Sequence, residues 1–151
     1  MIDGVSIRPL RRIPDERGTI MKMLEASDPE FRGFGEVYFS TVYPGVVKGW
    51  HRHPQTWVNY CVVHGMIKLV LVDLREASPT YRETSELFMG GQNYCLVQIP
   101  PGVWNGFKGV GTGVAMVCNV TDRTHADEVI ERLHPHHNGV IAYDENGKDG
   151  A

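Results

Sequence analysis

The chain has 151 residues, enough for one domain with a sizeable core and too few for a multidomain enzyme. Its 15 Lys and Arg against 18 Asp and Glu give a net charge of −3, so no basic field attracts a phosphate backbone and we expect no nucleic-acid partner. Every apolar run is shorter than the roughly 20 residues that a membrane span requires, so we expect no membrane association. With 17 Gly and 9 Pro, the composition favours turns and an all-β fold.

The N-terminal arm is the first predicted element. The first 14 residues are polar, but they carry apolar side chains at Val5, Ile7, Leu10 and Ile13. This content is enough for an edge strand, which can cover an exposed edge by pairing with a second copy of the chain. We therefore expect a homodimer that forms by strand exchange of this arm.

The rest of the chain predicts short strands separated by turn residues at intervals of about ten positions, a spacing typical of sandwiches and barrels. The predicted strands cover residues 20–24, 36–43, 57–64, 66–74, 84–89, 93–99 and 114–120. One short helix is predicted over 126–132, capped by Thr124. We expect residues 1–143 to form a single domain and the polar residues 144–151 to form a flexible tail.

Three cysteines, Cys61, Cys95 and Cys118, each lie in an apolar run and form no Cys-x-x-Cys pair. This pattern predicts buried free thiols. The odd number of cysteines and the polar start of the chain argue against a disulfide-forming compartment, so we expect the protein to be cytoplasmic.

Two histidines, His51 and His53, stand two positions apart in the stretch Gly-Val-Val-Lys-Gly-Trp-His-Arg-His at 45–53. On an extended chain both side chains point to one face. Their spacing fits the first half of a cupin metal motif, but Val58 and Asn105 occupy the positions of the remaining ligands. A histidine pair without a carboxylate is a poor metal site, so we expect no metal and no cofactor.

The same pair suits acid–base chemistry better, because a neutral imidazole can take a proton from the carbon next to a ketone. The plainer alternative is that both histidines are partly exposed structural residues at a strand end.

Several motifs follow one another along the chain in a fixed order. They are Asp-Glu-Arg-Gly at 15–18, the Gly-x-x-Lys-Gly-x-His stretch at 45–51, Val-Asp-Leu-Arg at 72–75, Ser-Pro-Thr-Tyr at 78–81, Ile-Pro-Pro-Gly at 99–102 and Asn-Gly-Phe at 105–107. Read together, they resemble the dTDP-4-dehydrorhamnose 3,5-epimerase family, whose members act on nucleotide-linked 4-keto sugars. The resemblance implies a cupin-type jelly-roll β-barrel and runs from about residue 15 to residue 143.

The resemblance also implies roles for individual residues. His51 falls on the family's catalytic base, and Lys48 stands where the family has an arginine that contacts substrate. Arg17 matches an arginine near the nucleotide phosphates, and Arg75 belongs to a segment near the subunit contact or the sugar pocket. A bulge at Gly49 would turn Lys48 to the face that carries His51.

Four positions depart from the family pattern. Its enolate-stabilising lysine aligns with Val58, its second histidine with Asn105 and its tyrosine acid with Cys118. The carboxylate partner of its base falls within 133–136, where the chain has no Asp.

We therefore expect a rearranged site in which His51 removes the proton and His53 or Lys48 carries the enolate charge. Asn59 and Asn105 would donate hydrogen bonds to the sugar. Tyr38, Tyr60 and Tyr94 are the candidate acids, of which we assign Tyr60 to catalysis and Tyr38 to substrate binding.

The predicted function is epimerisation of a dTDP- or GDP-linked 4-keto-6-deoxy sugar, at one or two carbons, through an enolate. It would serve deoxysugar or surface polysaccharide biosynthesis. The alternatives are a sugar-nucleotide ketoisomerase, a metal-dependent cupin and a non-catalytic barrel that binds a sugar nucleotide.

Overall fold

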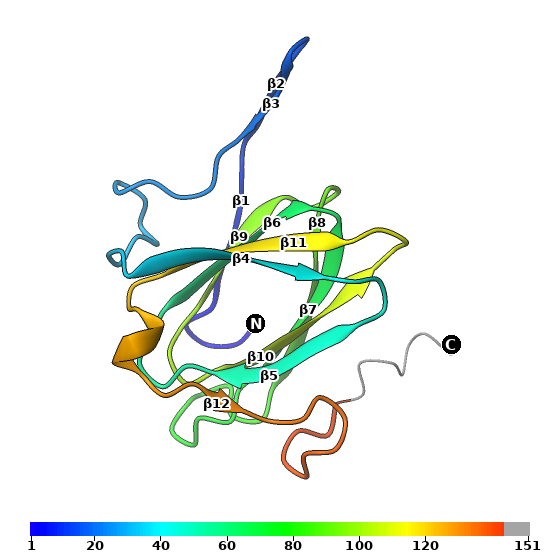
Figure 1. The fold of residues 1–151 in the computed structure, drawn as a ribbon. Coiled ribbons are helices and arrows are strands. Elements are labelled where there is room, and N and C mark those ends of the chain that lie inside the picture. The colour runs from blue at the N-terminus through cyan, green and yellow to red at the C-terminus, as the bar shows by residue number, and fades with distance from the viewer. Residues whose placement is uncertain (144–151) are drawn as a thin grey trace.

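The computed structural model describes residues 1–143, in which two five-stranded antiparallel sheets face each other and a separate hairpin projects away from them (Figure 1). The first sheet has the order β1-β9-β6-β11-β4, the second β12-β5-β10-β7-β8, and the hairpin is β2-β3. The strands are β1 (Ser6–Pro9), β2 (Arg12–Asp15), β3 (Gly18–Met21), β4 (Glu36–Val42), β5 (Val47–Arg52), β6 (Val58–His64), β7 (Met66–Val72), β8 (Thr84–Gly90), β9 (Cys95–Ile99), β10 (Trp104–Val110), β11 (Ala115–Thr121) and β12 (Glu131–Arg132). This arrangement confirms the predicted all-β, cupin-type jelly-roll fold.

The core lies between the two sheets. Strands β6, β7 and β9 are almost continuously apolar and buried, as expected for strands covered on both faces. Phe107 of β10 and Val117 of β11 reach into the same cluster from the two sheets. Burial of this apolar area is the main force that holds the two sheets together.

A second cluster covers the outer face of the first sheet. Cys61 and Cys118, which are register partners on β6 and β11, pack there with Tyr94. Leu10, Met21 and Met23 of the N-terminal region lie over this cluster. The cysteines, Cys95 among them, are free and buried, as predicted.

The N-terminal arm contains the expected edge strand. β1 pairs with β9 of the same chain, from Ser6 opposite Gln98 to Pro9 opposite Cys95. Beyond it the chain leaves the barrel as the β2–β3 hairpin (Figure 1).

A buried carboxylate fastens the start of the chain to the barrel. Asp73, whose side chain is fully buried, accepts hydrogen bonds from Arg75 Nε at 2.9 Å and from the hydroxyls of Ser78 and Thr80 at 2.6 Å. Arg75 Nη2 also donates to the carbonyl of Asp3 at 2.7 Å. The motifs at 72–75 and 78–81 therefore form one structural unit.

The close approach of β5 and β10 depends on glycine. Asn105 is paired with His51 but Phe107 with Lys48, so β5 has one residue more than β10 between these pairs. A Cβ atom on Gly49 would lie 3.1 Å from Gly106 Cα. The bulge expected at Gly49 is present, and it turns Lys48 toward the barrel interior.

The predicted strands from residue 36 onward agree with β4, β6, β7, β8, β9 and β11, whereas β5 and β10 were not predicted. The predicted helix over 126–132 is wrong. The structure has a single 3-10 turn, His125–Asp127, and Thr124 makes no side-chain capping bond. Glu131 and Arg132 instead form β12, because their backbone pairs with β5 and Glu131 binds Arg52 at 2.6 Å.

The predicted tail at 144–151 lies outside the described residues. No helix within residues 1–143 is long and apolar enough to cross a membrane.

Candidate active site

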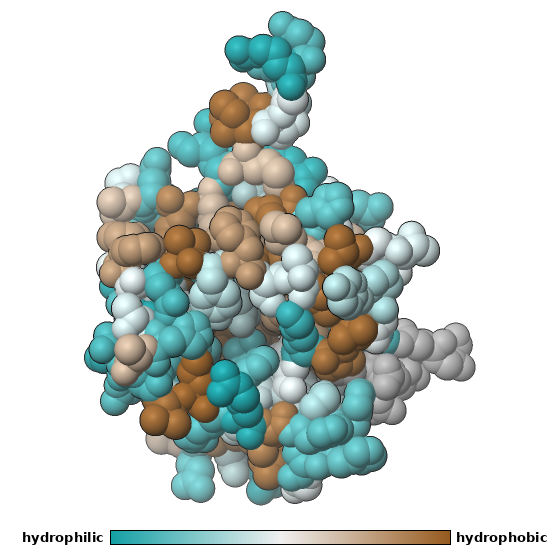
Figure 2. Space-filling view, in the orientation of Figure 1, coloured by the Kyte–Doolittle hydropathy of each residue, from teal (hydrophilic) through white to brown (hydrophobic). Residues whose placement is uncertain are grey.

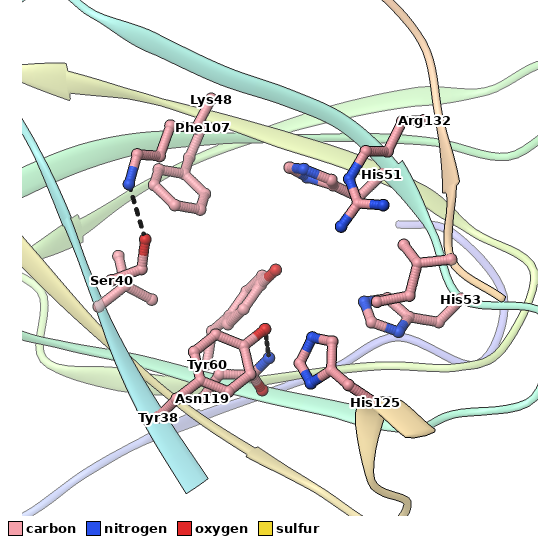
Figure 3. Close-up of a pocket in the computed structure, with 12 residues that line it drawn as sticks. Tyr38, Ser40, Lys48, His51, His53, Tyr60, Phe107, Asn119, His125 and Arg132 are labelled. Carbon is pink, nitrogen blue, oxygen red and sulfur yellow. Dashed lines mark hydrogen bonds between the residues drawn. The ribbon is translucent and has the colours of Figure 1, made fainter. Parts of the chain in front are cut away.

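A cavity of about 260 Å³ opens between the inner faces of the two sheets (Figure 3). Strands of both sheets and the 3-10 turn supply its lining. The lining residues are Tyr38, Ser40, Lys48, His51, His53, Tyr60, Phe107, Val117, Asn119, His125, Ile130 and Arg132. Imidazole, ammonium, guanidinium and phenol groups therefore meet in one small space.

His51 projects into this cavity from β5 (Figure 3). Burial lowers its pKa to about 4, and the positive charges of Arg132, His53 and Lys48 act in the same direction. The ring is therefore neutral at pH 7 and free to accept a proton. Among residues 1–143, no carboxylate forms an ion pair with it.

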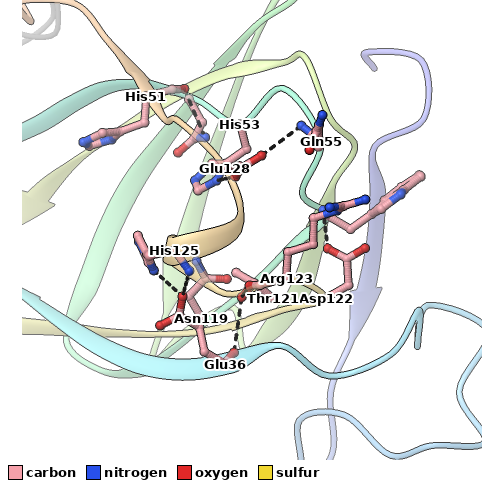
Figure 4. A network of polar contacts seen from close by, with 12 residues as sticks. Glu36, His51, His53, Gln55, Asn119, Thr121, Asp122, Arg123, His125 and Glu128 are labelled. Atoms are coloured by element: carbon pink, nitrogen blue, oxygen red, sulfur yellow. Dashed lines mark hydrogen bonds and ion pairs between the residues drawn. The ribbon is translucent and has the colours of Figure 1, made fainter.

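Of the neighbouring His51 and His53, it is His53 that has a carboxylate partner (Figure 4). Its Nδ1 lies 2.7 Å from Glu128 Oε1, and the Gln55 amide donates to the other carboxylate oxygen at 3.0 Å. Burial alone would raise the pKa of Glu128, but its hydrogen bonds, including that from His53, outweigh burial and hold the pKa below the usual value. Glu128 is thus an anion beside an imidazole.

The sequence did not reveal Glu128 as this partner, because the family resemblance places the carboxylate within 133–136. Glu128 directly follows the 3-10 turn, in a segment that we expected to be helical.

Two further cations line the cavity. Lys48 Nζ donates to Ser40 Oγ at 3.0 Å, across from β5 to β4. Arg132, on β12, lies near His51 at the other end of the cavity (Figure 3). Together they give the cavity the positive potential that a developing oxyanion needs.

The tyrosine hydroxyls differ in their hydrogen-bond partners. Tyr60 is buried and donates to Asn105 Oδ1 at 3.0 Å. Tyr38 accepts a hydrogen bond from Asn119 Nδ2 at 2.8 Å, so its own proton is available to a ligand. Burial raises the pKa of both groups, which keeps both uncharged. Tyr94 lies outside the cavity, where its hydroxyl donates to the carbonyl of Lys22.

His125 is a cavity residue that the sequence did not single out. Its ring Nδ1 binds Glu36 Oε1, and its backbone amide donates to the same oxygen (Figure 4). The edge of its ring contacts Tyr38, with the centroids 5.2 Å apart. Glu36 therefore pairs with His125 and not with His51.

Four of the predicted substrate-binding residues are not among the residues that line the cavity. The side chain of Asn59 forms hydrogen bonds with Val120 and Gln98, and that of Asn105 forms hydrogen bonds with Tyr60 and the His51 carbonyl. Both side chains therefore lie behind the residues that line the cavity. Arg75 belongs to the Asp73 unit. Arg17 is at the tip of the projecting hairpin, paired with Asp15 at 2.6 Å.

The amide that reaches the cavity is Asn119, two positions after Val117 on β11. This alternation, like that of Tyr38 and Ser40 on β4, is the signal in the sequence that could have identified it. Within the described part of the chain, no group of three His, Cys, Asp or Glu residues could hold a metal ion.

The fold and the site together define a class of protein, a small jelly roll with an acid–base cavity between its two sheets. Residues 1–143 match the dTDP-4-dehydrorhamnose 3,5-epimerase family, and the chain belongs to that family. Membership places it among the nucleotide-sugar epimerases, which are isomerases.

Individual relatives agree with this assignment. The chain is 32% identical to the spore coat polysaccharide biosynthesis protein SpsL of Bacillus subtilis, over 97% of both chains. It is 33% identical to the probable low-salt glycan biosynthesis epimerase Agl13 of Haloferax volcanii, over 78% of this chain and 77% of that one. The structure is similar to that of a dTDP sugar isomerase from Desulfovibrio desulfuricans, with a TM-score of 0.92, 39% identity and coverage of 97% and 93%.

Proposed function

We propose that this enzyme epimerises a nucleotide-linked 4-keto-6-deoxy sugar without a cofactor, by removing a proton from a carbon next to the C4 ketone. The observation that carries the proposal is the neutral His51 ring in a cavity that is also lined by Lys48, Arg132 and His53, the last of which is paired with Glu128. A neutral base next to fixed positive charge is what enolate chemistry requires.

The relatives support a dTDP-linked substrate and a role in polysaccharide biosynthesis. SpsL and Agl13 are named for spore coat polysaccharide and glycan biosynthesis. An epimerase from Legionella pneumophila, 26% identical with a TM-score of 0.77, was solved in complex with dTDP-4-keto-L-rhamnose. The free cysteines favour a reducing compartment, so we expect the enzyme to act in the cytoplasm.

In the reaction, the C–H bond next to the ketone breaks, the proton passes to His51 and the electron pair moves to the C4 oxygen as an enolate. Lys48 and His53 stabilise that negative charge, and the enolate in turn stabilises the imidazolium formed at His51. Tyr38 donates its free proton to a sugar hydroxyl. Tyr60 remains a candidate catalytic group, but Asn105 already holds its proton.

The enzyme acts as a homodimer in this proposal. A two-stranded hairpin alone is marginally stable in water, and Ile20 on this hairpin is 63% exposed. Figure 2 shows apolar side chains gathered on the face formed by β4 and β11, where Phe39 is 60% exposed. A second copy would cover both surfaces, and the hairpin is the element that would carry Arg17 to the partner's nucleotide.

Product analysis by proton NMR tests the proposal, with dTDP- and GDP-linked 4-keto-6-deoxy sugars as substrates. Inversion at C3 or C5 changes the ring coupling constants and supports epimerisation. Movement of the carbonyl to C3 would instead identify a ketoisomerase. No conversion, with a substrate-dependent rise in melting temperature, would leave a binding barrel. Stoichiometric Fe, Mn or Zn in protein purified without chelator would support the metal-dependent alternative.

A further inference from the structure

The cavity has acid–base groups on two sides. His51 enters from β5 of the second sheet, whereas His125 comes from the 3-10 turn that follows β11 of the first sheet. Figure 3 shows the two rings on opposite sides of the cavity, with room for a sugar between them. Inversion of a carbon requires this arrangement, because the proton leaves one face and the new proton arrives at the other.

We propose that His125, paired with Glu36, is the acid that protonates the enolate on the face opposite His51. This inference rests on the proposed function and names the second catalytic residue of the same site. As the enolate collapses to the ketone, the carbon takes a proton from His125 Nε2. His125 becomes neutral, His51 keeps the proton that it removed, and both rings then equilibrate with water.

The contacts of His125 suit this role. Nδ1 is bound to Glu36, which leaves Nε2 as the ring nitrogen that can deliver a proton. The backbone bond to the same carboxylate oxygen and the edge contact with Tyr38 fix the direction of the ring. The hydrogen bond from the His125 ring lowers the pKa of Glu36, so an ionised carboxylate lies against Nδ1.

The position of the family's acid, Tyr60 and His53 are less well placed to deliver this proton. The position of the family's tyrosine acid holds Cys118, which packs against Cys61 and Tyr94 on the outer face of the sheet. The Tyr60 proton is held by Asn105. His53 is paired with its own carboxylate, Glu128. It directly follows β5, the strand that carries His51.

Two measurements in heavy water distinguish protonation of the enolate by His125 from a role of His125 in binding or deprotonation. One is deuterium exchange into unconverted substrate, which reports removal of the proton by His51. The other is the rate of formation of inverted product, which requires both faces. The variants are His125→Gln and Glu36→Gln, and the matched control is His64→Gln, which changes an exposed histidine at the end of β6.

We expect His125→Gln to lower the rate of inversion about 10²- to 10⁴-fold, the usual range for a general acid, while exchange into substrate stays within a few-fold of wild type. Glu36→Gln should lower inversion about tenfold, as expected for loss of one charge-assisted hydrogen bond, again without loss of exchange. The control should match the wild type in both measurements.

Two results would overturn the inference. Inversion by His125→Gln at the wild-type rate would show that another group supplies the proton. Equal loss of exchange and inversion, with an unchanged melting temperature, would show that His125 acts in binding or deprotonation. If the wild-type protein neither exchanges nor inverts any of the substrates, the proposed function itself fails, and this inference with it.

Discussion

His53 Nδ1 lies 2.7 Å from Glu128 Oε1, and the two side chains are only 8% and 4% exposed. The carboxylate Glu128 thus belongs to the second histidine of the His51–His53 pair. This pairing divides the work between them. His53 is paired with the anionic Glu128 and lies next to the position of the enolate, whereas His51 remains neutral and free to accept a proton.

Glu128→Gln tests this division. Loss of the anion removes the carboxylate partner that fixes the His53 ring next to the enolate, so we expect kcat to fall about 10²-fold, within the range for general acid–base groups. Steady-state kinetics on the purified variant measures the change, with Glu25→Gln, an exposed glutamate outside the cavity, as control. Wild-type kcat in Glu128→Gln would mean that the pair is structural.

The pH dependence of kcat/KM follows from the pKa of His51. Because the ring must be neutral to act as a base and its pKa is about 4, kcat/KM should be level around neutrality and fall as the pH drops through about 4. Removing the charge of Arg132 raises that pKa, so Arg132→Ala should move the acid limb to higher pH.

Arg11→Ala, on the N-terminal arm, is the matched control for charge and should leave the limb in place. An acid limb of kcat/KM that moves to lower pH in Arg132→Ala would contradict the assignment of His51 as base. An acid limb at the ordinary histidine pKa in the wild type would also contradict it.

Mutation of Gly49 tests the bulge between β5 and β10. A methyl group at Gly49 would lie 3.1 Å from Gly106 Cα, so the strands must separate. We expect Gly49→Ala to lower the free energy of unfolding by about 1–3 kcal/mol, as overpacking usually does, and to raise KM by displacing Lys48. Urea unfolding and steady-state kinetics measure both effects. Gly91→Ala, where a Cβ meets no atom within 4 Å, should change neither.

The buried Asp73 makes the free energy of unfolding depend on pH in the acid range. Burial would raise its pKa, but hydrogen bonds from Arg75, Ser78 and Thr80 outweigh burial and hold the pKa below the usual range. A carboxyl whose pKa is lower in the folded state stabilises the protein at neutral pH, and this contribution disappears as the pH falls below about 4.

Asp73→Asn should therefore cost about 3 kcal/mol at pH 7, because it leaves Arg75 without its buried partner, and less as the pH falls. Urea unfolding between pH 3 and pH 7 measures the difference. A constant difference over this range would contradict the account.

The hairpin supplies a test of assembly. Ile20→Asp places a charge on an exposed apolar position that we expect a second copy to cover. Light scattering after gel filtration should give a dimer for the wild type and a larger monomer fraction for Ile20→Asp, with Lys22→Gln, which changes the net charge by the same amount, as a control for charge alone. A wild-type monomer would exclude the homodimer.

Most of the fold could be predicted because β-branched and aromatic residues alternate with turn residues, and this pattern identified strands such as β6 and β7. The pattern fails in β5 and β10, where Gly49 and Gly106 replace the side chains that mark a strand. It also fails after residue 125, where pairing with β5 and the His53–Glu128 contact override a weak local preference for helix.

The site was only partly predictable. His51, His53 and Lys48 stand together in one motif, so the sequence brought them together. Glu128 and His125 come from a segment more than seventy residues later, and only the antiparallel closure of the barrel brings His125 to the cavity and Glu128 to His53. Arg75 and Asn59 looked like ligand-binding groups, but their polar atoms satisfy buried partners instead.

Deuterium exchange from solvent, followed by proton NMR in heavy water for wild type and His51→Asn, tests whether His51 removes the proton next to the ketone. We expect loss of the C3 or C5 proton signal of a dTDP-linked 4-keto-6-deoxy sugar with the wild type and its retention with His51→Asn. Exchange at the same rate in both proteins, or no exchange in the wild type with any dTDP- or GDP-linked substrate, would contradict it.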